Sequence, residues 1–193
     1  MRTTAALLLL CFALPAAAQP TPDDPSTWAQ TAKGVRILGG SASLTRFSGN
    51  TSALLSPRIG RLLADNLALS ARVTLGYSRS TTLLDGTSSS TQLGLGPTLT
   101  YYVGEPTGDA VRPFAEGNLS LSYSRFHSDL LDALGTEADA QWSIGGGLSA
   151  GVELPIARNV ALRGEAFYNV SDLTFDGEVS FYGVGVGFST FLY

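Results

Sequence analysis

The chain has 193 residues with 12 basic and 16 acidic side chains, and its formal net charge is −4. The acidic balance argues against nucleic acid as a partner, and no segment after the first 18 residues offers the 18 consecutive apolar residues of a membrane-spanning helix. These features exclude a nucleic-acid-binding protein and a helical membrane protein, and the length fits one domain.

The first 18 residues have the three regions of a secretory signal peptide: Arg2, the apolar stretch Ala5 to Leu14, and the small residues before Gln19. We expect residues 1–18 to be cleaved, because the apolar run is shorter than the ~20 residues of a membrane anchor. Cys11 is the chain's one cysteine, so the mature protein is expected to have no disulfide.

Residues 19–34 are rich in Pro, Asp, Ser and Thr and lack periodicity, which predicts a flexible periplasmic leader. Residues 35–193 carry eight runs in which apolar side chains alternate with small or polar ones. The clearest run spans residues 67–78, and similar runs follow at 92–103, 115–123, 142–154, 160–170 and 182–188. Two earlier runs, near 35–47 and 51–63, alternate less cleanly, and their registers stay open.

The connections between these runs alternate in kind. Residues 63–66, 104–110 and 155–159 form compact connections, whereas 79–91, 127–139 and 171–178 are longer or more polar. Short turns on one side and longer loops on the other are typical of outer-membrane barrels, in which the short side is periplasmic. An even strand count then places both termini in the periplasm.

The composition of the polar face distinguishes a membrane barrel from a soluble sandwich. That face consists of Gly, Ser and Thr with few charges, and the whole chain has one lysine, Lys33. A solvated face would carry many charged residues, whereas small side chains suit the narrow lumen of eight strands. The runs also reach the ~9 to 11 residues that cross a bilayer at a tilt. We therefore predict an eight-stranded antiparallel up-and-down transmembrane β-barrel.

Aromatic residues on the apolar face provide a second test, because they prefer the membrane interface. The assumed strand directions place five of them at the outer rim, which a soluble sandwich does not predict. These expected membrane-interface aromatics are Tyr77, Tyr123, Trp142, Tyr168 and Tyr182.

The segments SPRIG…LADNLALSARVTLGYS, QLGLGPTLTYYV, RPFAEGNLSLSYS and the terminal GVGVGFSTFLY resemble small outer-membrane β-barrel proteins. Those relatives are the transmembrane domain of outer-membrane protein A and the opacity-type porins. The resemblance implies a location in the bacterial outer membrane, and it makes Tyr193 the aromatic assembly signal read by the barrel assembly machinery. Outer-membrane lipid and lipopolysaccharide are the other expected partners of this monomer. Within residues 182–188 the apolar side chains have even residue numbers, whereas Phe191 and Tyr193 have odd numbers and so fall on the other face of the strand. We therefore expect a bulge near Ser189 or an inward aromatic.

Six charged residues fall on the predicted lumen face, and they are expected to form an interior polar network: Arg58, Arg72, Glu116, Glu153, Arg163 and Glu165. Three arginines balance three glutamates, so pairing would satisfy them. Tyr102, Phe114 and Phe167 are expected to fill space that facing glycines leave, which argues against a permanent aqueous channel. A gated ion path through the network is the alternative.

No catalytic, cofactor or metal site is expected. His127, Ser128 and Asp129 are adjacent, and three successive residues do not generally reach the geometry of a catalytic triad. Outer-membrane lipid A deacylases separate their His and Ser by one residue, which this chain does not. The acidic loop residues lack calcium-loop spacing, although they could attract divalent cations. The sequence thus favours a non-enzymatic envelope or surface-interaction protein, with a narrow pore or a lipid A-modifying enzyme as alternatives.

Overall fold

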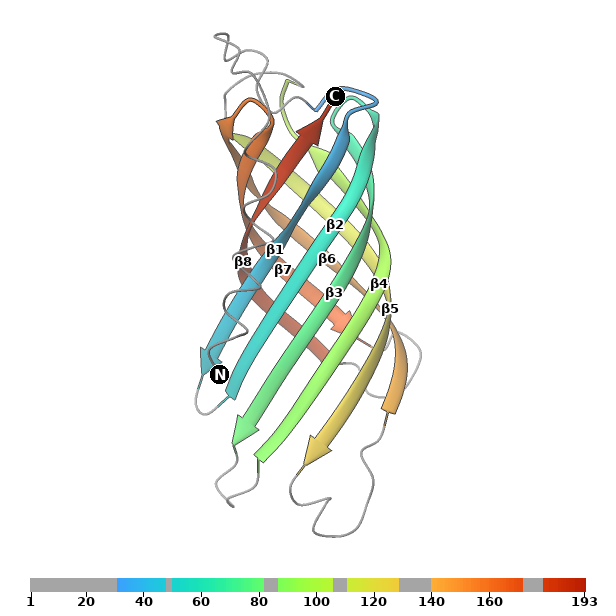
Figure 1. Cartoon of the computed structure of the whole chain (residues 1–193), viewed down its shortest axis with the longest axis vertical. Helices are drawn as coiled ribbons and strands as arrows, with labels where there is room; N and C mark the ends of the chain where they lie inside the picture. Colours follow the sequence, from blue (N-terminus) through green and yellow to red (C-terminus); the bar gives the residue numbers. More distant parts are fainter. Residues whose placement is uncertain (1–30, 48–49, 82–86, 106–110, 129–139, 172–178) are drawn as a thin grey trace.

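The computed structural model describes residues 31–47, 50–81, 87–105, 111–128, 140–171 and 179–193. They form eight strands, each hydrogen-bonded antiparallel to its neighbours in the chain, and β1 pairs with β8 to close a barrel (Figure 1). The strands are β1 (Arg36–Phe47), β2 (Asn50–Ala64), β3 (Leu67–Thr81), β4 (Thr87–Tyr102), β5 (Arg112–Ser128), β6 (Ala140–Ala157), β7 (Val160–Ser171) and β8 (Val179–Leu192). The predicted eight-stranded antiparallel barrel is confirmed. In the described part of the chain, no helix is long and apolar enough to cross a bilayer.

The two ends of the barrel differ. The turn end carries the start of β1, the end of β8 and the connections β2–β3, β4–β5 and β6–β7, while the loop end carries the other four connections. Asn66 makes the β2–β3 turn with a φ of 64°, a left-handed conformation that asparagine tolerates. Its side-chain amide donates to the carbonyl of Gly104 at 2.7 Å, which ties two connections of the turn end together.

The predicted contrast between short and long connections is partly wrong. The segment 79–91 was expected to be a loop, but β3 and β4 remain paired as far as Thr81 and Thr87. The β4–β5 connection, predicted at residues 104–110, spans residues 103–111 and is longer than the β3–β4 connection. Hydroxyl-bearing residues such as Ser88 continue the strand because their backbone groups form ladder hydrogen bonds like those of any other residue.

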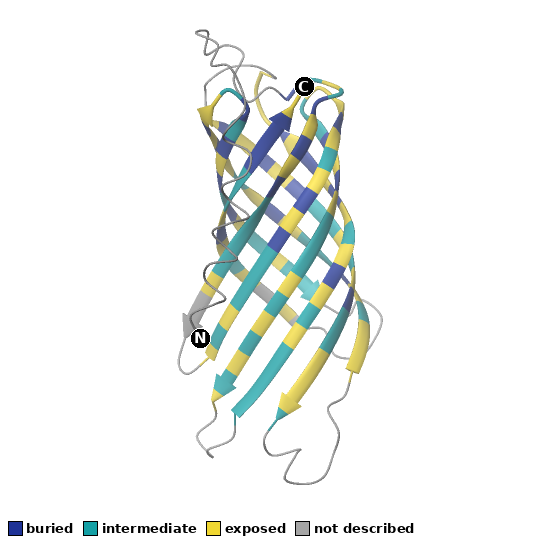
Figure 2. Cartoon of the chain, in the orientation of Figure 1, coloured by how far each residue is buried: buried dark blue, intermediate teal, exposed yellow. Residues whose placement is uncertain are grey.

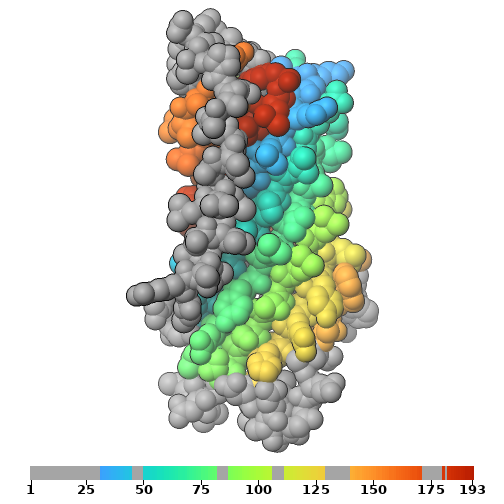
Figure 3. Space-filling model, in the orientation of Figure 1, coloured from blue at the N-terminus to red at the C-terminus, as the bar shows by residue number. Residues whose placement is uncertain are grey.

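The alternation of the strands separates two faces. Large apolar side chains on the outward face are exposed, among them Leu38, Ile59, Leu69, Leu75, Leu93, Leu95, Leu119, Leu148, Leu162, Val184 and Val186. Bands of exposed and less exposed residues alternate along the strands in Figure 2. In the space-filling view the side chains of β2, β3 and β4 lie against one another along the face of the barrel that is seen (Figure 3). Exposed apolar surface on this scale is unusual in a water-soluble monomer and matches the lipid-facing band of a membrane barrel.

The structure settles the registers that the sequence left open. In β1 the even residues such as Leu38 face outward, and in β2 the odd residues such as Ile59 do. In β8 the pairing with β1 and β7 continues through Ser189 without a shift, so no bulge is present there. Phe191 is fully buried. It is therefore the inward aromatic, the second of the two predicted possibilities.

The turn end of the lumen is filled by an apolar core. Its members are Val35, Ile37, Leu62, Ala68, Tyr102, Phe114, Ala161 and Phe191. Buried residues accordingly gather toward the end that carries the C-terminus (Figure 2). Among the described residues, the packed apolar core thus lies at the turn end of the lumen.

Residues 31–34, the described part of the predicted leader, are held against the barrel and do not form the expected flexible segment. Residues 31–34 pack against the turn end, where Thr31 is fully buried and bonds to Asn66. The backbone N–H of Lys33 donates to Asp65 at 2.8 Å, and that of Gly34 donates to the carbonyl of Leu62 at 2.9 Å. The predicted signal peptide 1–18 and the rest of the leader lie outside the described residues.

Candidate functional site

The six lumen charges predicted from the sequence lie together inside the barrel. They come from five strands: Arg58 from β2, Arg72 from β3, Glu116 from β5, Glu153 from β6, and Arg163 and Glu165 from β7. Alternation places each of them on the inward face, although the residues are far apart in the sequence. We refer to these six residues as the lumen cluster.

Glu116 is the centre of the lumen cluster. One carboxylate oxygen accepts hydrogen bonds from Arg58 and Arg163, both at 2.8 Å, and the other is bonded to Arg72. Thr100 also donates to this carboxylate at 2.8 Å. The side chain of Glu116 has no exposed surface, so three guanidinium groups compensate one buried carboxylate.

Arg163 joins the three glutamates. It bonds to Glu165 through Nε at 2.9 Å and through Nη2 at 2.8 Å, and its Nη1 lies 3.5 Å from Glu153. Glu153 in turn accepts from Ser189 at 2.8 Å. Such a network fixes side chains from opposite walls of the lumen, because each buried charge keeps a partner only in this arrangement.

Aromatic rings join the lumen cluster to the apolar core. The guanidinium of Arg163 lies 3.6 Å from the ring centroid of Phe114, within the range of a cation–π contact. The ring of Tyr102 lies 6.4 Å from those of Phe114 and Phe191. Phe167 occupies the space that Gly183 leaves, since a Cβ on that glycine would lie 2.7 Å from the ring. The three aromatics expected to fill the lumen thus lie in it.

Arg112, a further inward arginine at the start of β5, was not predicted from the sequence. Arg112 is buried, and its guanidinium lies 5.5 Å from the ring centroid of Phe191. Within the described residues none of its three guanidinium nitrogens has a hydrogen-bond partner. Arg112 alternates with Phe114 and Glu116 along β5, so their shared inward face could have identified it from the sequence.

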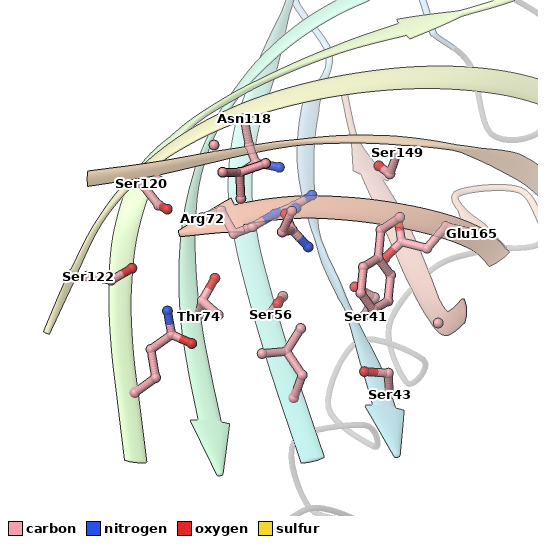
Figure 4. A pocket seen from close by; sticks show the side chains of 18 residues that line it. Ser41, Ser43, Ser56, Arg72, Thr74, Asn118, Ser120, Ser122, Ser149 and Glu165 are labelled. Carbon is pink, nitrogen blue, oxygen red and sulfur yellow. The ribbon is translucent and has the colours of Figure 1, made fainter. Parts of the chain in front are cut away.

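A polar cavity of about 60 Å³ lies in the lumen on the loop side of the cluster. Arg72, Glu165 and Ser149 line it together with hydroxyl and amide side chains (Figure 4), including Ser41, Ser43, Ser56, Thr74, Gln92, Asn118, Ser120, Ser122 and Asn169. A polar cavity of this size has room for several water molecules. The lumen therefore has room for water on the loop side of the cluster and is packed on the turn side.

The five aromatics that were predicted at the membrane interface lie on the outward face toward the loop end. Tyr123 and Trp142 are cross-strand partners with ring centroids 5.2 Å apart, and Tyr168 pairs with Tyr182. The fifth, Tyr77, is exposed on β3. The C-terminal residue Tyr193 is exposed at the turn end, where the guanidinium of Arg158 lies 5.9 Å from its ring centroid.

The histidine motif has no triad geometry in its described part. His127 and Ser128 are successive residues of β5, so their side chains point to opposite faces of the strand. Asp129 and the other acidic loop residues lie outside the described residues. Among the side chains that the structure describes, no group of three His, Cys, Asp or Glu could hold a metal ion.

Comparisons with known proteins agree with this architecture. Residues 4–190 match the family model described as the outer membrane protein beta-barrel domain. The outer membrane protein OprG from Pseudomonas aeruginosa is 18% identical, with 86% of this chain and 99% of that chain covered and a TM-score of 0.55. The N-terminal β-barrel domain of OprF from the same organism is 17% identical, with 84% and 100% covered and a TM-score of 0.49. No curated protein sequence matches the chain.

Proposed function

Since the chain belongs to the outer membrane protein beta-barrel domain family, we propose that it is a non-enzymatic barrel with an envelope-stabilising or surface-interaction role. Its location is the bacterial outer membrane, as for the family. The observation that supports the proposal is the filling of the lumen at the turn end by the lumen cluster and the apolar core. A lumen of eight strands encloses little more than its own side chains, so this filling leaves the loops and the outer wall as the surfaces that meet other molecules.

Planar-bilayer recording tests this proposal. The folded chain is expected to give no steady ion current, because the Arg58–Glu116 and Arg163–Glu165 pairs and the rings beneath them close the lumen. Glu105→Gln, a change at an exposed residue of the β4–β5 connection, serves as a matched control. A steady unitary current through the wild-type chain and through Glu105→Gln would contradict the closed barrel.

A narrow pore is the second candidate, and the polar cavity favours it. The cavity extends down to Arg72 and Glu165, so an ion that enters it meets the lumen cluster directly. Conduction would require the cluster to exchange ion-pair partners while the apolar core opens. A steady current through the wild-type chain that changes when Glu116 is replaced would support this candidate.

The lipid A-modifying enzyme is a weaker alternative. It requires His127 to act on an acyl ester at the outer surface, and its neighbour Ser128 faces the other side of the strand. The expected result is that lipid A from cells that express the chain keeps all its acyl chains. A loss of acyl chains that disappears in His127→Ala would overturn the non-enzymatic proposal.

The proposed partners are outer-membrane lipid, lipopolysaccharide and the barrel assembly machinery. Tyr193, exposed at the end of the last strand, is the proposed contact with that machinery. The closed sheet leaves no unpaired strand edge among the described residues, which supports a monomer. Sedimentation of the folded chain in detergent tests the monomer, and a dimer mass would contradict it.

A further inference from the structure

Two arginines lie side by side on the outer wall at the turn end. Arg36 of β1 and Arg61 of β2 are direct cross-strand partners, and both are exposed. The N–H of Leu62 donates to the carbonyl of Val35, so the adjacent Arg36–Arg61 position is a non-hydrogen-bonded one. Side chains approach most closely at such positions, with Cα atoms about 4.5 Å apart. The register therefore holds two like charges next to each other.

Nothing in the described part of the chain neutralises this pair. Like charges directly opposite each other destabilise a sheet, and neither Arg36 nor Arg61 forms an ion pair with a described acidic residue. Asp65, on the adjoining turn, accepts the backbone N–H of Lys33. Nη2 of Arg61 lies within 3.8 Å of the position that a Cβ on Gly34 would take, so this guanidinium reaches the segment of exposed Lys33. Among the described residues named here, three basic side chains stand against one carboxylate, so the local charge is positive.

The pair borders the apolar wall. The next outward residues of the same strands are Leu38 and Ile59, which are 43% and 64% exposed. Leu192 and Leu69 pair with Arg36 and Arg61 on their other sides. Guanidinium groups at the edge of a lipid-facing band lie at the level of the headgroups, where the planar fork of arginine suits bidentate binding of a phosphate.

We propose that Arg36 and Arg61 form a binding site for the phosphate of an anionic phospholipid in the leaflet at the turn end, with Lys33 adding charge. The lipid's acyl chains lie along Leu38 and Ile59. This inference rests on the proposed function insofar as the outer wall faces lipid and the turn end is periplasmic. The periplasmic leaflet supplies phospholipids, so a phospholipid and not lipopolysaccharide is the ligand. The bound phosphate lowers the repulsion between the two guanidinium groups.

Native mass spectrometry of the folded chain tests the site. The protein is reconstituted in nanodiscs with equal amounts of phosphatidylglycerol and phosphatidylcholine of the same acyl chains, released into detergent, and assayed for retained lipid. A basic residue at a membrane surface strengthens binding of anionic lipid about fivefold, so the pair predicts an enrichment of phosphatidylglycerol of up to about 25-fold. Arg36→Gln/Arg61→Gln is expected to lower the ratio toward one.

Arg79→Gln/Arg125→Gln provides the matched control, because both residues are exposed, outward-facing arginines near the loop end. This control is expected to lower the ratio much less than Arg36→Gln/Arg61→Gln does, because Arg79 and Arg125 lie on strands separated by β4 and do not form one paired site. Heat-modifiable gel mobility confirms folding, so a folded barrel without enrichment overturns the site while the proposed function stands. An unchanged ratio in Arg36→Gln/Arg61→Gln, or an equal loss in the control, also overturns it. If the double variant fails to fold, Arg36→Gln and Arg61→Gln alone should each lower the ratio about fivefold, and no change in either refutes the proposal.

Discussion

Replacement of Glu116 by glutamine tests the energetic role of the lumen cluster. The carboxylate accepts hydrogen bonds from Arg58, Arg163 and Thr100 at 2.8 Å each and is also paired with Arg72. Glutamine keeps the shape but removes the charge, which leaves three arginines against two glutamates in the lumen cluster. Breaking a buried ion pair by removing one partner costs about 3–5 kcal/mol. Because Arg72 lines the cavity and its side chain is 15% exposed, we expect a loss at the lower limit, about 3 kcal/mol.

Urea unfolding of the barrel in phospholipid vesicles measures this loss, followed by tryptophan fluorescence and by the gel mobility of the folded form. Glu105→Gln removes an exposed carboxylate and should change the free energy of unfolding by less than about 0.5 kcal/mol. Arg72→Gln/Glu116→Gln leaves two arginines against two glutamates in the lumen cluster, so it should recover about 1 kcal/mol of the loss. A loss below about 1 kcal/mol in Glu116→Gln, or no recovery in the double variant, would refute the reasoning.

Three further changes probe the wall, the core and the C-terminus. Gly96→Ala brings a Cβ into steric conflict with the carbonyl oxygen of Leu119, so it should lower the urea midpoint. Gly117→Ala is the control, because the new Cβ would lie 3.7 Å from its nearest neighbour, and it should leave the midpoint nearly unchanged. Equal effects of the two variants would contradict the close approach of β4 and β5 at Gly96. Phe191→Ala removes a fully buried ring and should cost about 3–5 kcal/mol in urea unfolding, and a cost under about 1 kcal/mol would show that the ring is not packed. Deletion of Tyr193 should reduce the amount of barrel in the outer-membrane fraction without changing refolding in detergent, and an unchanged amount would argue against an assembly signal.

The sequence predicts the strands and the lumen cluster because both depend on alternation alone. In β3 to β7 most apolar residues share one parity and face outward, so a charge of the opposite parity, such as Glu116 or Arg163, must face inward. Inward charges in a narrow lumen have few partners except one another. Pairing could therefore be predicted, but not which arginine bonds to which glutamate, since that depends on how the lumen brings distant strands together.

The strand registers could not be predicted at the turn end, where the lumen is apolar. At the turn end Ile37, Leu62 and Phe191 face inward, so both faces of β1, β2 and β8 are apolar there and the alternation fades. The same packing explains the odd parity of Phe191 and the burial of Thr31. Arg112 was missed for a related reason, because it precedes the apolar run of β5 and its burial depends on the rings beneath it.

Site-directed spin labelling tests most directly whether the exposed leucine wall contacts lipid. The chain's single cysteine, Cys11, falls in the predicted signal peptide, so labels can be introduced singly into the mature barrel. A label at Leu148→Cys, where the native side chain is 68% exposed, should collide often with dissolved oxygen and rarely with a water-soluble nickel chelate in vesicles. A label at Glu105→Cys, on the exposed turn end, should show the reverse. Nickel access at position 148 equal to that at position 105 would contradict the lipid-facing wall.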